Sequence, residues 1–244
     1  MRLTRVHVPG PLASGKSQTI EGDAANHITR VLRLERGDSL IVFDGRGGEH
    51  AARIVELRKD AVLVAVGDHS TAVRESTLSL TLAQGVSRGE RMDWVVQKAT
   101  ELGVTRIVPV LTERTVVKLG AQQAERKLLH WRGIATAACE QSGRDRVPVV
   151  DMPLALAAFL AASDSRATRV LLSPTGDRGI GGLPRPGADV VVLIGPEGGL
   201  AEAEQRAALA AGFLAVRLGP RVLRTETAAV AALTLIQHHF GDLK

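Results

Sequence analysis

Two loops rich in glycine and proline constrain the fold of this chain more than any other feature. Residues 195–199 (Gly-Pro-Glu-Gly-Gly) follow the apolar run 190–194, and residues 218–227 follow the run 213–217. Each loop joins the end of an expected strand to the start of an expected helix. Backbone N–H groups at a helix start have no partner within the helix, and ligands of α/β folds bind where strands end. We therefore expect a nucleotide-like ligand at these loops.

The composition fits a globular chain of one or two domains. Its 244 residues, 45% of them hydrophobic, are enough for a substantial core. No apolar run approaches the roughly 20 residues of a membrane-spanning helix, and the first residues lack the apolar region of a signal peptide. The single cysteine, Cys139, excludes an internal disulfide and a cysteine metal cluster. We expect a cytoplasmic protein with no membrane partner and no bound metal.

Arginine dominates the positive charge of the chain. The formal net charge is +5, arginine outnumbers lysine by 25 to 6, and the basic excess falls within residues 73–150. Because the guanidinium donates hydrogen bonds in a fixed planar geometry, arginine suits phosphate, although a GC-rich genome produces the same composition. Four phenylalanines, two tryptophans and no tyrosine argue against a row of base-stacking aromatics. Charge and shape would then carry any RNA binding.

Residues 1–70 have the pattern of a small β-barrel built from hairpins. Strands are expected at residues 2–8, 39–43, 49–57 and 61–66, with turns between them. One helix interrupts the strands over residues 24–34, and Asp23 is expected to cap its N-terminus. We therefore predict a first domain at residues 1–70.

From residue 73 onward, strands alternate with helices, which indicates a largely parallel sheet. Ser87 and Glu90 have the spacing of a capping box ahead of a helix that reaches Leu102, and Thr225 is expected to cap the last helix. We predict an α/β domain over residues 73–244. Its strands are expected at residues 78–82, 106–111, 147–150, 169–172, 190–194 and 213–217, and its other helices at residues 121–142, 154–162, 201–211 and 226–240.

Residues 10–17 (Gly-Pro-Leu-Ala-Ser-Gly-Lys-Ser) match the pattern of a phosphate-binding P-loop. In such a loop Lys16 contacts the terminal phosphates, and Asp44 imitates the strand-end aspartate that helps to hold magnesium. A P-loop opens directly into a helix, whereas residues 18–22 have the pattern of a strand stopped by glycine. We expect a mobile surface loop here and keep a P-loop NTPase as the alternative from a different function class.

Five segments resemble the RsmE family, the SPOUT-class methyltransferases that modify N3 of one uridine in bacterial small-subunit (16S) ribosomal RNA. They are residues 193–199 (LIGPEGG), 218–228 (LGPRVLRTETA), 90–104, 112–114 and 138–144, and residues 27–33 match more loosely. The resemblance implies a SPOUT-type trefoil-knot domain with a mainly parallel sheet, a PUA-like RNA-binding β-barrel at the N-terminus, and a homodimer. Periodicity by itself argues against such a knot. A related knotted methyltransferase that acts on another RNA site stays as an alternative.

The resemblance also implies S-adenosylmethionine as the cofactor and 16S ribosomal RNA as the partner. Independently of it, the carboxylate of Glu197 would repel phosphate, so the loop favours a neutral or cationic ligand. The expected cofactor-binding residues come from three loops: Leu172, Ser173, Ile194, Gly195, Glu197, Gly198, Gly199, Leu218, Gly219, Leu223, Arg224 and Thr227.

Methyl transfer from a sulfonium to a ring nitrogen requires proximity, in-line aim and a deprotonated nitrogen. A guanidinium stabilises the resulting anion and a carboxylate accepts the proton. We expect Arg224, Arg144 and Glu140 to be catalytic, with Arg114 and Glu226 as further candidates, although Glu140 and Arg144 have the i, i+4 spacing of a simple ion pair. RNA contacts are expected from Arg30, Arg33, Arg91, Lys98 and Arg114.

Overall fold

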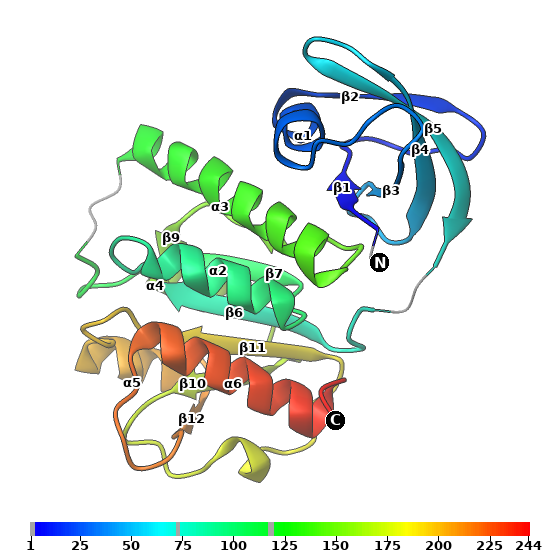
Figure 1. The fold of residues 1–244 in the computed structure, drawn as a ribbon. Helices are drawn as coiled ribbons and strands as arrows, with labels where there is room; N and C mark the ends of the chain where they lie inside the picture. The colour runs from blue at the N-terminus through cyan, green and yellow to red at the C-terminus, as the bar shows by residue number, and fades with distance from the viewer. Residues whose placement is uncertain (1–2, 72–73, 117–119) are drawn as a thin grey trace. The chain divides into compact units, whose positions relative to one another are not determined.

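The computed structural model describes residues 3–71, 74–116 and 120–244 (Figure 1). The chain forms two compact units. Unit 1 comprises Met1–Glu75 and Cys139–Val147, and unit 2 comprises Ser76–Ala138 and Pro148–Lys244. Arg2, where the first strand was expected to begin, and Val73, where the second domain was expected to begin, lie outside the described residues.

Unit 1 is built on a five-stranded sheet with the order β1-β3-β4-β5-β2. The pair β1–β3 is parallel and the other pairs are antiparallel. Alternate residues, such as Leu40, Ile54 and Val64, point into one apolar core. The predicted strands at 39–43 and 49–57 are confirmed, and the strand predicted at 61–66 is longer. The strands are β1 (Arg5–His7), β2 (Ser17–Glu21), β3 (Ser39–Phe43), β4 (Glu49–Leu57) and β5 (Ala61–Ser70).

The helix predicted over residues 24–34 is shorter and irregular. Helix α1 (Gly22–Asn26) follows Glu21, whose extended backbone occupies the N-cap position, so the prediction that Asp23 caps this helix is wrong. A π-helical segment, η1 (His27–Val31), continues it. Ala25 and Ile28 are buried in the apolar core of unit 1 and hold both segments against the sheet.

Residues 10–17 lack the structural context of a P-loop. Strand β2 begins at Ser17 and pairs antiparallel with β5, so this loop runs into a strand and not into the helix N-terminus that a P-loop needs. The Gly15 N–H donates to the Val66 carbonyl, and the Val66 N–H donates to the Lys16 carbonyl, both at 2.8 Å. The P-loop NTPase alternative is therefore wrong, and the end of the loop is fastened to β5 by the backbone.

Residues 139–147, which were predicted to belong to the second domain, pack within unit 1. Arg144 is 4% exposed, and its Nη2 lies 2.6 Å from Glu75 Oε2. Arg5 donates to the Arg144 carbonyl at 3.0 Å and forms a buried ion pair with Glu49, which Arg74 also contacts at 2.8 Å. These partners lie far away in sequence, which is why local patterning placed the segment in the wrong unit.

Unit 2 contains a parallel sheet with the order β12-β10-β11-β6-β7-β8, and β9 also pairs with β7. The parallel pairing confirms the predicted α/β class, whereas the trefoil knot stays a prediction. The strands are β6 (Ser79–Gly85), β7 (Arg106–Leu111), β8 (Val149–Val150), β9 (Leu154–Ala155), β10 (Thr168–Leu172), β11 (Asp189–Ile194) and β12 (Leu214–Val216).

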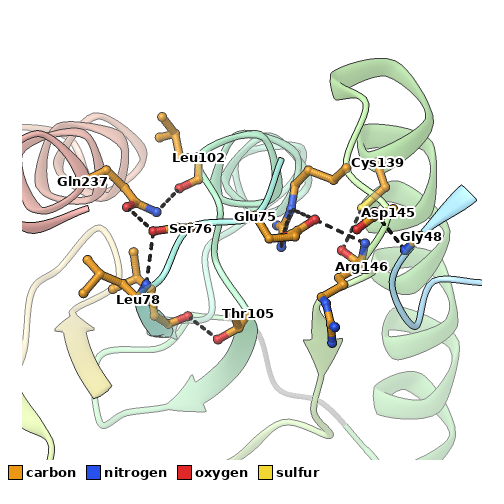
Figure 2. Close-up of polar contacts among 12 residues, drawn as sticks. Gly48, Glu75, Ser76, Leu78, Leu102, Thr105, Cys139, Asp145, Arg146 and Gln237 are labelled. Carbon is orange, nitrogen blue, oxygen red and sulfur yellow. Dashed lines mark hydrogen bonds and ion pairs between the residues drawn. The ribbon is translucent and has the colours of Figure 1, made fainter. Parts of the chain in front are cut away.

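Helices cover both faces of this sheet. Helices α2 and α6 lie side by side over one face (Figure 1), and α4 and α5 pack on the other over a core that includes Phe159 and Phe213. The fully buried Gln237 of α6 accepts a hydrogen bond from Ser76 at 2.8 Å and donates one to the Leu102 carbonyl at 2.9 Å (Figure 2). The helices are α2 (Arg91–Glu101), α3 (Ala121–Ser142), α4 (Leu156–Ala162), α5 (Glu202–Ala210), α6 (Thr225–Phe240) and the short η2 (Ile180–Gly182).

Two predicted helix caps are wrong. Glu90 is itself the N-cap of α2 and makes no side-chain cap hydrogen bond, while Ser87 donates to the Gly85 carbonyl instead. Thr225 is the first residue of α6 rather than its N-cap, a position that Arg224 occupies. In each case the polar side chain bonds to a group outside the helix, which sequence spacing does not reveal.

Candidate functional site

A cavity of about 570 Å³ lies in unit 2 at the carboxyl ends of the neighbouring strands β12, β10 and β11. The loops after these strands line it, because the carboxyl ends of parallel strands meet at one edge of a sheet. Ligands of open α/β sheets bind at this edge, and the volume lies within the ~300–1,000 Å³ of small-molecule sites. The structure therefore brings together the two loops that the sequence singled out.

Ten of the twelve predicted cofactor-binding residues line this cavity, and Gly219 and Thr227 are outside the lining. Gly219 instead has a φ of 71°, so it makes the turn after β12 in a conformation that favours glycine. The ten lining residues are Leu172, Ser173, Ile194, Gly195, Glu197, Gly198, Gly199, Leu218, Leu223 and Arg224.

Glycines allow the backbones around the cavity to approach closely. A Cβ on Gly85, at the end of β6, would overlap the Pro196 ring nitrogen and lie 2.8 Å from the Gly195 carbonyl carbon. A Cβ on Gly195 would lie 2.9 Å from the Leu200 nitrogen. The loop after β11 is therefore packed against β6 and against itself at distances that only glycine permits.

A buried hydrogen-bond chain holds this loop against the start of α6. The Thr225 hydroxyl donates to the Gly195 carbonyl at 2.7 Å and accepts from Gln84 Nε2 at 2.8 Å. Gln84 of β6 is fully buried, and its Oε1 has no hydrogen-bond partner within the described part of the chain. Sequence reasoning missed Gln84, whose only signal is a polar residue in an apolar strand.

Glu197 is anchored at the rim of the cavity. Its Oε1 accepts hydrogen bonds from the Arg88 N–H at 2.9 Å and from Arg91 Nη1 at 2.8 Å. Partial burial opposes ionisation, but these hydrogen bonds outweigh it and hold the pKa of Glu197 below its ordinary value. The side chain is thus a fixed anion near neutral pH, which agrees with the expectation that Glu197 disfavours a phosphate ligand.

Glu226 provides a second carboxylate in the cavity lining. Arg91 Nε lies 3.9 Å from its Oε1, so one guanidinium contacts both carboxylates. Its Oε2 is buried and has no hydrogen-bond partner among the residues that the structure describes. Two carboxylates beside one cavity favour a ligand that carries positive charge over a phosphate.

Two of the predicted arginines, Arg114 and Arg224, line the cavity but differ in their hydrogen bonding. Arg114 Nη1 donates to the Gly198 carbonyl at 2.9 Å, and its stem packs on the Cα of Gly198. Arg224 is exposed at the N-cap of α6, and within the described ranges no hydrogen bond or ion pair is recorded for its side chain. Arg224 is therefore available to contact a substrate.

The other two predicted catalytic residues lie in unit 1 and do not line the cavity. Arg144 pairs with Glu75, and Glu140 Oε1 accepts a hydrogen bond from the His7 N–H at 2.9 Å. Each therefore has a structural partner, and a catalytic role for either one stays a prediction.

The predicted RNA-binding residues are dispersed. Arg91 and Arg114 line the cavity, Lys98 donates to Glu101 at 2.8 Å, and Arg30 and Arg33 are exposed in unit 1. RNA contacts by these residues remain predictions. Residues 3–71, 74–116 and 120–244 hold no group of three metal-ligating side chains, and no helix within those ranges is long and apolar enough to cross a membrane.

Two family models match this chain. The RNA methyltransferase domain matches residues 74–237, and the RNA methyltransferase PUA domain matches residues 20–67, which confirms the predicted PUA-like domain. Ribosomal RNA small subunit methyltransferase E of Buchnera aphidicola is 30% identical over 99% of this chain and 98% of its own length. The Bacillus subtilis protein of the same name is 33% identical, over 90% of this chain and 89% of its own.

Solved structures agree over the full length. A ribosomal RNA small subunit methyltransferase E from Neisseria gonorrhoeae, bound to S-adenosyl methionine, is 37% identical with a TM-score of 0.94 and full coverage of both chains. A methyltransferase from Legionella pneumophila, in complex with the bound cofactor SAM, is 39% identical with a TM-score of 0.96 and the same coverage. This chain therefore belongs to the ribosomal RNA small subunit methyltransferase E family of RNA methyltransferases.

Proposed function

We propose that this protein transfers a methyl group from S-adenosylmethionine to N3 of one uridine in 16S ribosomal RNA. The observation that carries the proposal is the cavity at the ends of β10, β11 and β12, which combines two carboxylates with the exposed guanidinium of Arg224. Ribosomal RNA as the substrate is inferred from the names of the relatives, and S-adenosylmethionine as the cofactor is inferred from the ligands of the two solved structures.

The residues of the cavity fit S-adenosylmethionine. Leu172, Leu218 and Leu223 would provide apolar contacts for the cofactor, and backbone groups of residues 195–199 would provide hydrogen-bond donors and acceptors. Glu197 and Glu226 attract the positive charges of the ligand. When bound, the cofactor supplies an activated methyl group, so the protein has only to position the RNA and favour the uridine anion.

Arg224 and Glu226 have different roles in forming the uridine anion. As uridine N3 loses its proton, negative charge spreads to the uracil carbonyl oxygens, and the Arg224 guanidinium stabilises that charge. Two N–H donors hold Glu197, whereas Glu226 Oε2 has no hydrogen-bond partner among the described residues, so we assign the N3 proton to Glu226.

The only cysteine favours a ring nitrogen over a ring carbon as the methylated atom. Burial raises the pKa of the Cys139 thiol to about 12, so the thiol stays protonated near neutral pH. Methylation of a pyrimidine carbon needs a nucleophile that first adds to the ring, whereas a deprotonated nitrogen attacks directly. The chain therefore lacks a thiolate for the first route.

Three further assignments belong to the proposal. The family resemblance implies a homodimer, and Val222, which is 81% exposed in a cavity-lining loop, offers an apolar contact for a second copy. Exposed Arg30 and Arg33 would contact RNA phosphates from the PUA-like unit. We also propose a cytoplasmic location, because ribosomal RNA is the proposed substrate.

The position of the methyl group tests the proposal. Small subunits that lack the modification are incubated with the protein and isotopically labelled S-adenosylmethionine, and the labelled nucleotide is mapped. A methyl on N3 blocks Watson–Crick pairing, so reverse transcription should stop at one uridine. Subunits that already carry the modification serve as the control and should take up no label. Label on a ribose, or label without a stop, would contradict N3 as the target.

A further inference from the structure

Unit 1 contains a second cavity, of about 230 Å³, that methyl transfer does not use. We propose that it binds one nucleotide of single-stranded RNA whose base carries an exocyclic amino group. This inference rests on the proposed function, because the RNA substrate supplies that nucleotide. The lining residues come from the loop after β1, the turn between β3 and β4, and strands β4 and β5: Leu12, Ala13, Ser14, Asp44, Gly47, Gly48, His50 and His69.

The walls of this cavity are fixed by the backbone. The loop that carries Ser14 is bonded to β5 through Gly15. The Gly48 N–H donates to Asp145 Oδ2 at 2.9 Å (Figure 2), which holds the turn between β3 and β4. Gly47 and Gly48 have φ values of 117° and 81°, a conformation that few other residues adopt. The cavity is therefore preformed, which lowers the entropic cost of binding.

Two imidazoles form its aromatic wall. The ring centroids of His50 and His69 lie 4.9 Å apart, and His69 is exposed while His50 is 8% exposed. His50 Nδ1 lies 3.2 Å from the Gly67 carbonyl and 3.4 Å from the Ser14 hydroxyl, and in the tautomer that donates to the carbonyl, Nε2 is an acceptor. Single-stranded RNA bases stack on exposed histidine rings.

The polar groups of the cavity are mainly acceptors. Asp44 Oδ1 accepts the Arg46 N–H at 3.0 Å, which leaves Oδ2 for a ligand, and His50 Nε2 adds a second acceptor in the tautomer that donates from Nδ1 to Gly67. Carboxylates accept hydrogen bonds from the exocyclic amino groups of bases, and uracil has no such group. A carboxylate and the absence of lysine or arginine from the lining disfavour a phosphate inside the cavity.

Arg146 lies beside this cavity and fits the phosphate that accompanies a base. A Cβ on Gly47 would lie 2.9 Å from Arg146 Nη2, so the guanidinium rests on that glycine. The Arg146 N–H donates to Glu75 at 3.2 Å and its carbonyl accepts from Cys139 at 3.5 Å (Figure 2), which fixes its backbone. Its guanidinium is exposed and has no recorded partner among the described residues, so it is available to a phosphate.

The test uses the full-length protein saturated with S-adenosylhomocysteine, so that the larger cavity is filled. The four ribonucleoside 5′-monophosphates are titrated separately, and the imidazole signals of His50 and His69 are followed by NMR. We expect AMP, CMP and GMP to shift both signals and UMP to bind about fivefold or more weakly, since one good base contact gives that discrimination. Inorganic phosphate should leave both signals unchanged.

Variants separate stacking from base reading. His69→Ala should weaken binding about five- to tenfold, and His69→Phe should restore it because a ring is kept. Asp44→Asn replaces an acceptor by an amide that also donates, so the preference should move toward UMP. His27→Ala, an exposed histidine outside the cavity lining, is the matched control and should change nothing.

Three outcomes would overturn the subsite: no shift with any nucleotide, the same shifts with phosphate alone, or an unchanged base preference in Asp44→Asn. The methylation assay, run in parallel, separates this inference from the proposed function. If wild-type protein does not methylate the uridine but the nucleotides still shift His50 and His69, the proposed function fails and the subsite stands. If methylation proceeds and the signals do not move, only the subsite fails.

Discussion

At the scale of single residues, Arg91 shows the limit of local reasoning. Its place on a helix face suggested a contact with RNA phosphate. In the structure its Nη1 lies 2.8 Å from Glu197 Oε1 and its Nε 3.9 Å from Glu226 Oε1, so it ties two carboxylates of the cofactor cavity together. The two carboxylates are more than 90 positions away from Arg91 in sequence. Only the folded chain reveals that contact.

Arg224→Ala tests the catalytic assignment. The loss of a group that stabilises a developing charge costs ~10²–10³ in rate, so methyl transfer should fall by about that factor. S-adenosylmethionine binding, measured by calorimetry, should change little, because the carboxylates and backbone loops remain. Arg221→Ala, another exposed arginine of the lining, is the matched control. Full activity of Arg224→Ala on unmodified small subunits would refute the role.

Thr225→Val tests the buried hydrogen-bond chain. The substitution keeps the shape but removes the 2.7 Å hydrogen bond to the Gly195 carbonyl and the acceptor of Gln84 Nε2, which keeps only the Gly85 carbonyl at 3.0 Å and the Gly195 carbonyl at 3.5 Å, so we expect a cost of about 1–3 kcal/mol. Because Gly195 lines the cavity, affinity for S-adenosylmethionine should fall about tenfold, as measured by calorimetry. Thr225→Ser keeps the hydroxyl and should bind like the wild type. Equal affinities for all three proteins would show that the chain does not position the loop.

At the scale of elements, the sequence predicted regular segments well and their junctions poorly. Strand β7 and helix α3 have the predicted bounds, because hydrophobic periodicity over many residues is a local property. The caps at Ser87, Asp23 and Thr225 failed, since the partner of a polar side chain is chosen by tertiary packing. Tertiary packing also requires glycine at position 85, where a Cβ would overlap Pro196, although the sequence there is typical of an ordinary strand end.

Gly85→Ala should destabilise unit 2. Its Cβ would overlap Pro196, and backbone atoms cannot move aside as a flexible side chain can, so we expect a loss of about 1–3 kcal/mol in the free energy of unfolding. Gly133→Ala in α3 meets no atom within 4 Å and should stabilise by about 0.5–1 kcal/mol through helix propensity. Urea unfolding followed by tryptophan fluorescence measures both, because Trp94 and Trp131 lie in unit 2. The two substitutions should change the free energy of unfolding in opposite directions. Equal changes would contradict the close approach of Gly85 to Pro196.

At the scale of the whole molecule, the chain does not divide at one point. Cys139–Val147 belongs to unit 1, between two stretches that belong to unit 2. A truncation that removes residues 1–70 would therefore take Arg5 and Glu49 away and leave the buried Arg144 without its surroundings. The function of the PUA-like unit is better studied with point variants in the full chain.

Glu49→Gln should destabilise unit 1 at neutral pH. Glu49 is 7% exposed and pairs with Arg5 and Arg74, and removal of one partner of a buried ion pair costs about 3–5 kcal/mol. Hydrogen exchange of the β4 and β5 amides reports this loss in unit 1. The exposed pair Glu56–Arg58 supplies the control, since Glu56→Gln should leave exchange unchanged.

The same variant should show a defined pH dependence. Although burial opposes ionisation, Arg74 and Arg5 hold the pKa of Glu49 below its ordinary value of 4.5. A carboxyl whose pKa is lower in the folded state stabilises above its unfolded pKa, and that stabilisation is lost as the pH falls through the folded value. The difference in the stability of unit 1 between wild type and Glu49→Gln should therefore narrow below about pH 4.5. A stability difference that stays constant from pH 7 to pH 3 would contradict the stabilising role of ionised Glu49.

Sequence alone determined the α/β class, most strands and helices, and the two loops that bind the cofactor in the proposed function, because periodicity and glycine-proline turns are local properties. Tertiary structure decided which distant groups meet. The order of the parallel strands places the loops after β10, β11 and β12 around one cavity and sets Gln84 against Thr225, 141 positions away. It also buried Arg144 and left Arg224 exposed, because exposure depends on what packs above a residue rather than on its neighbours in sequence.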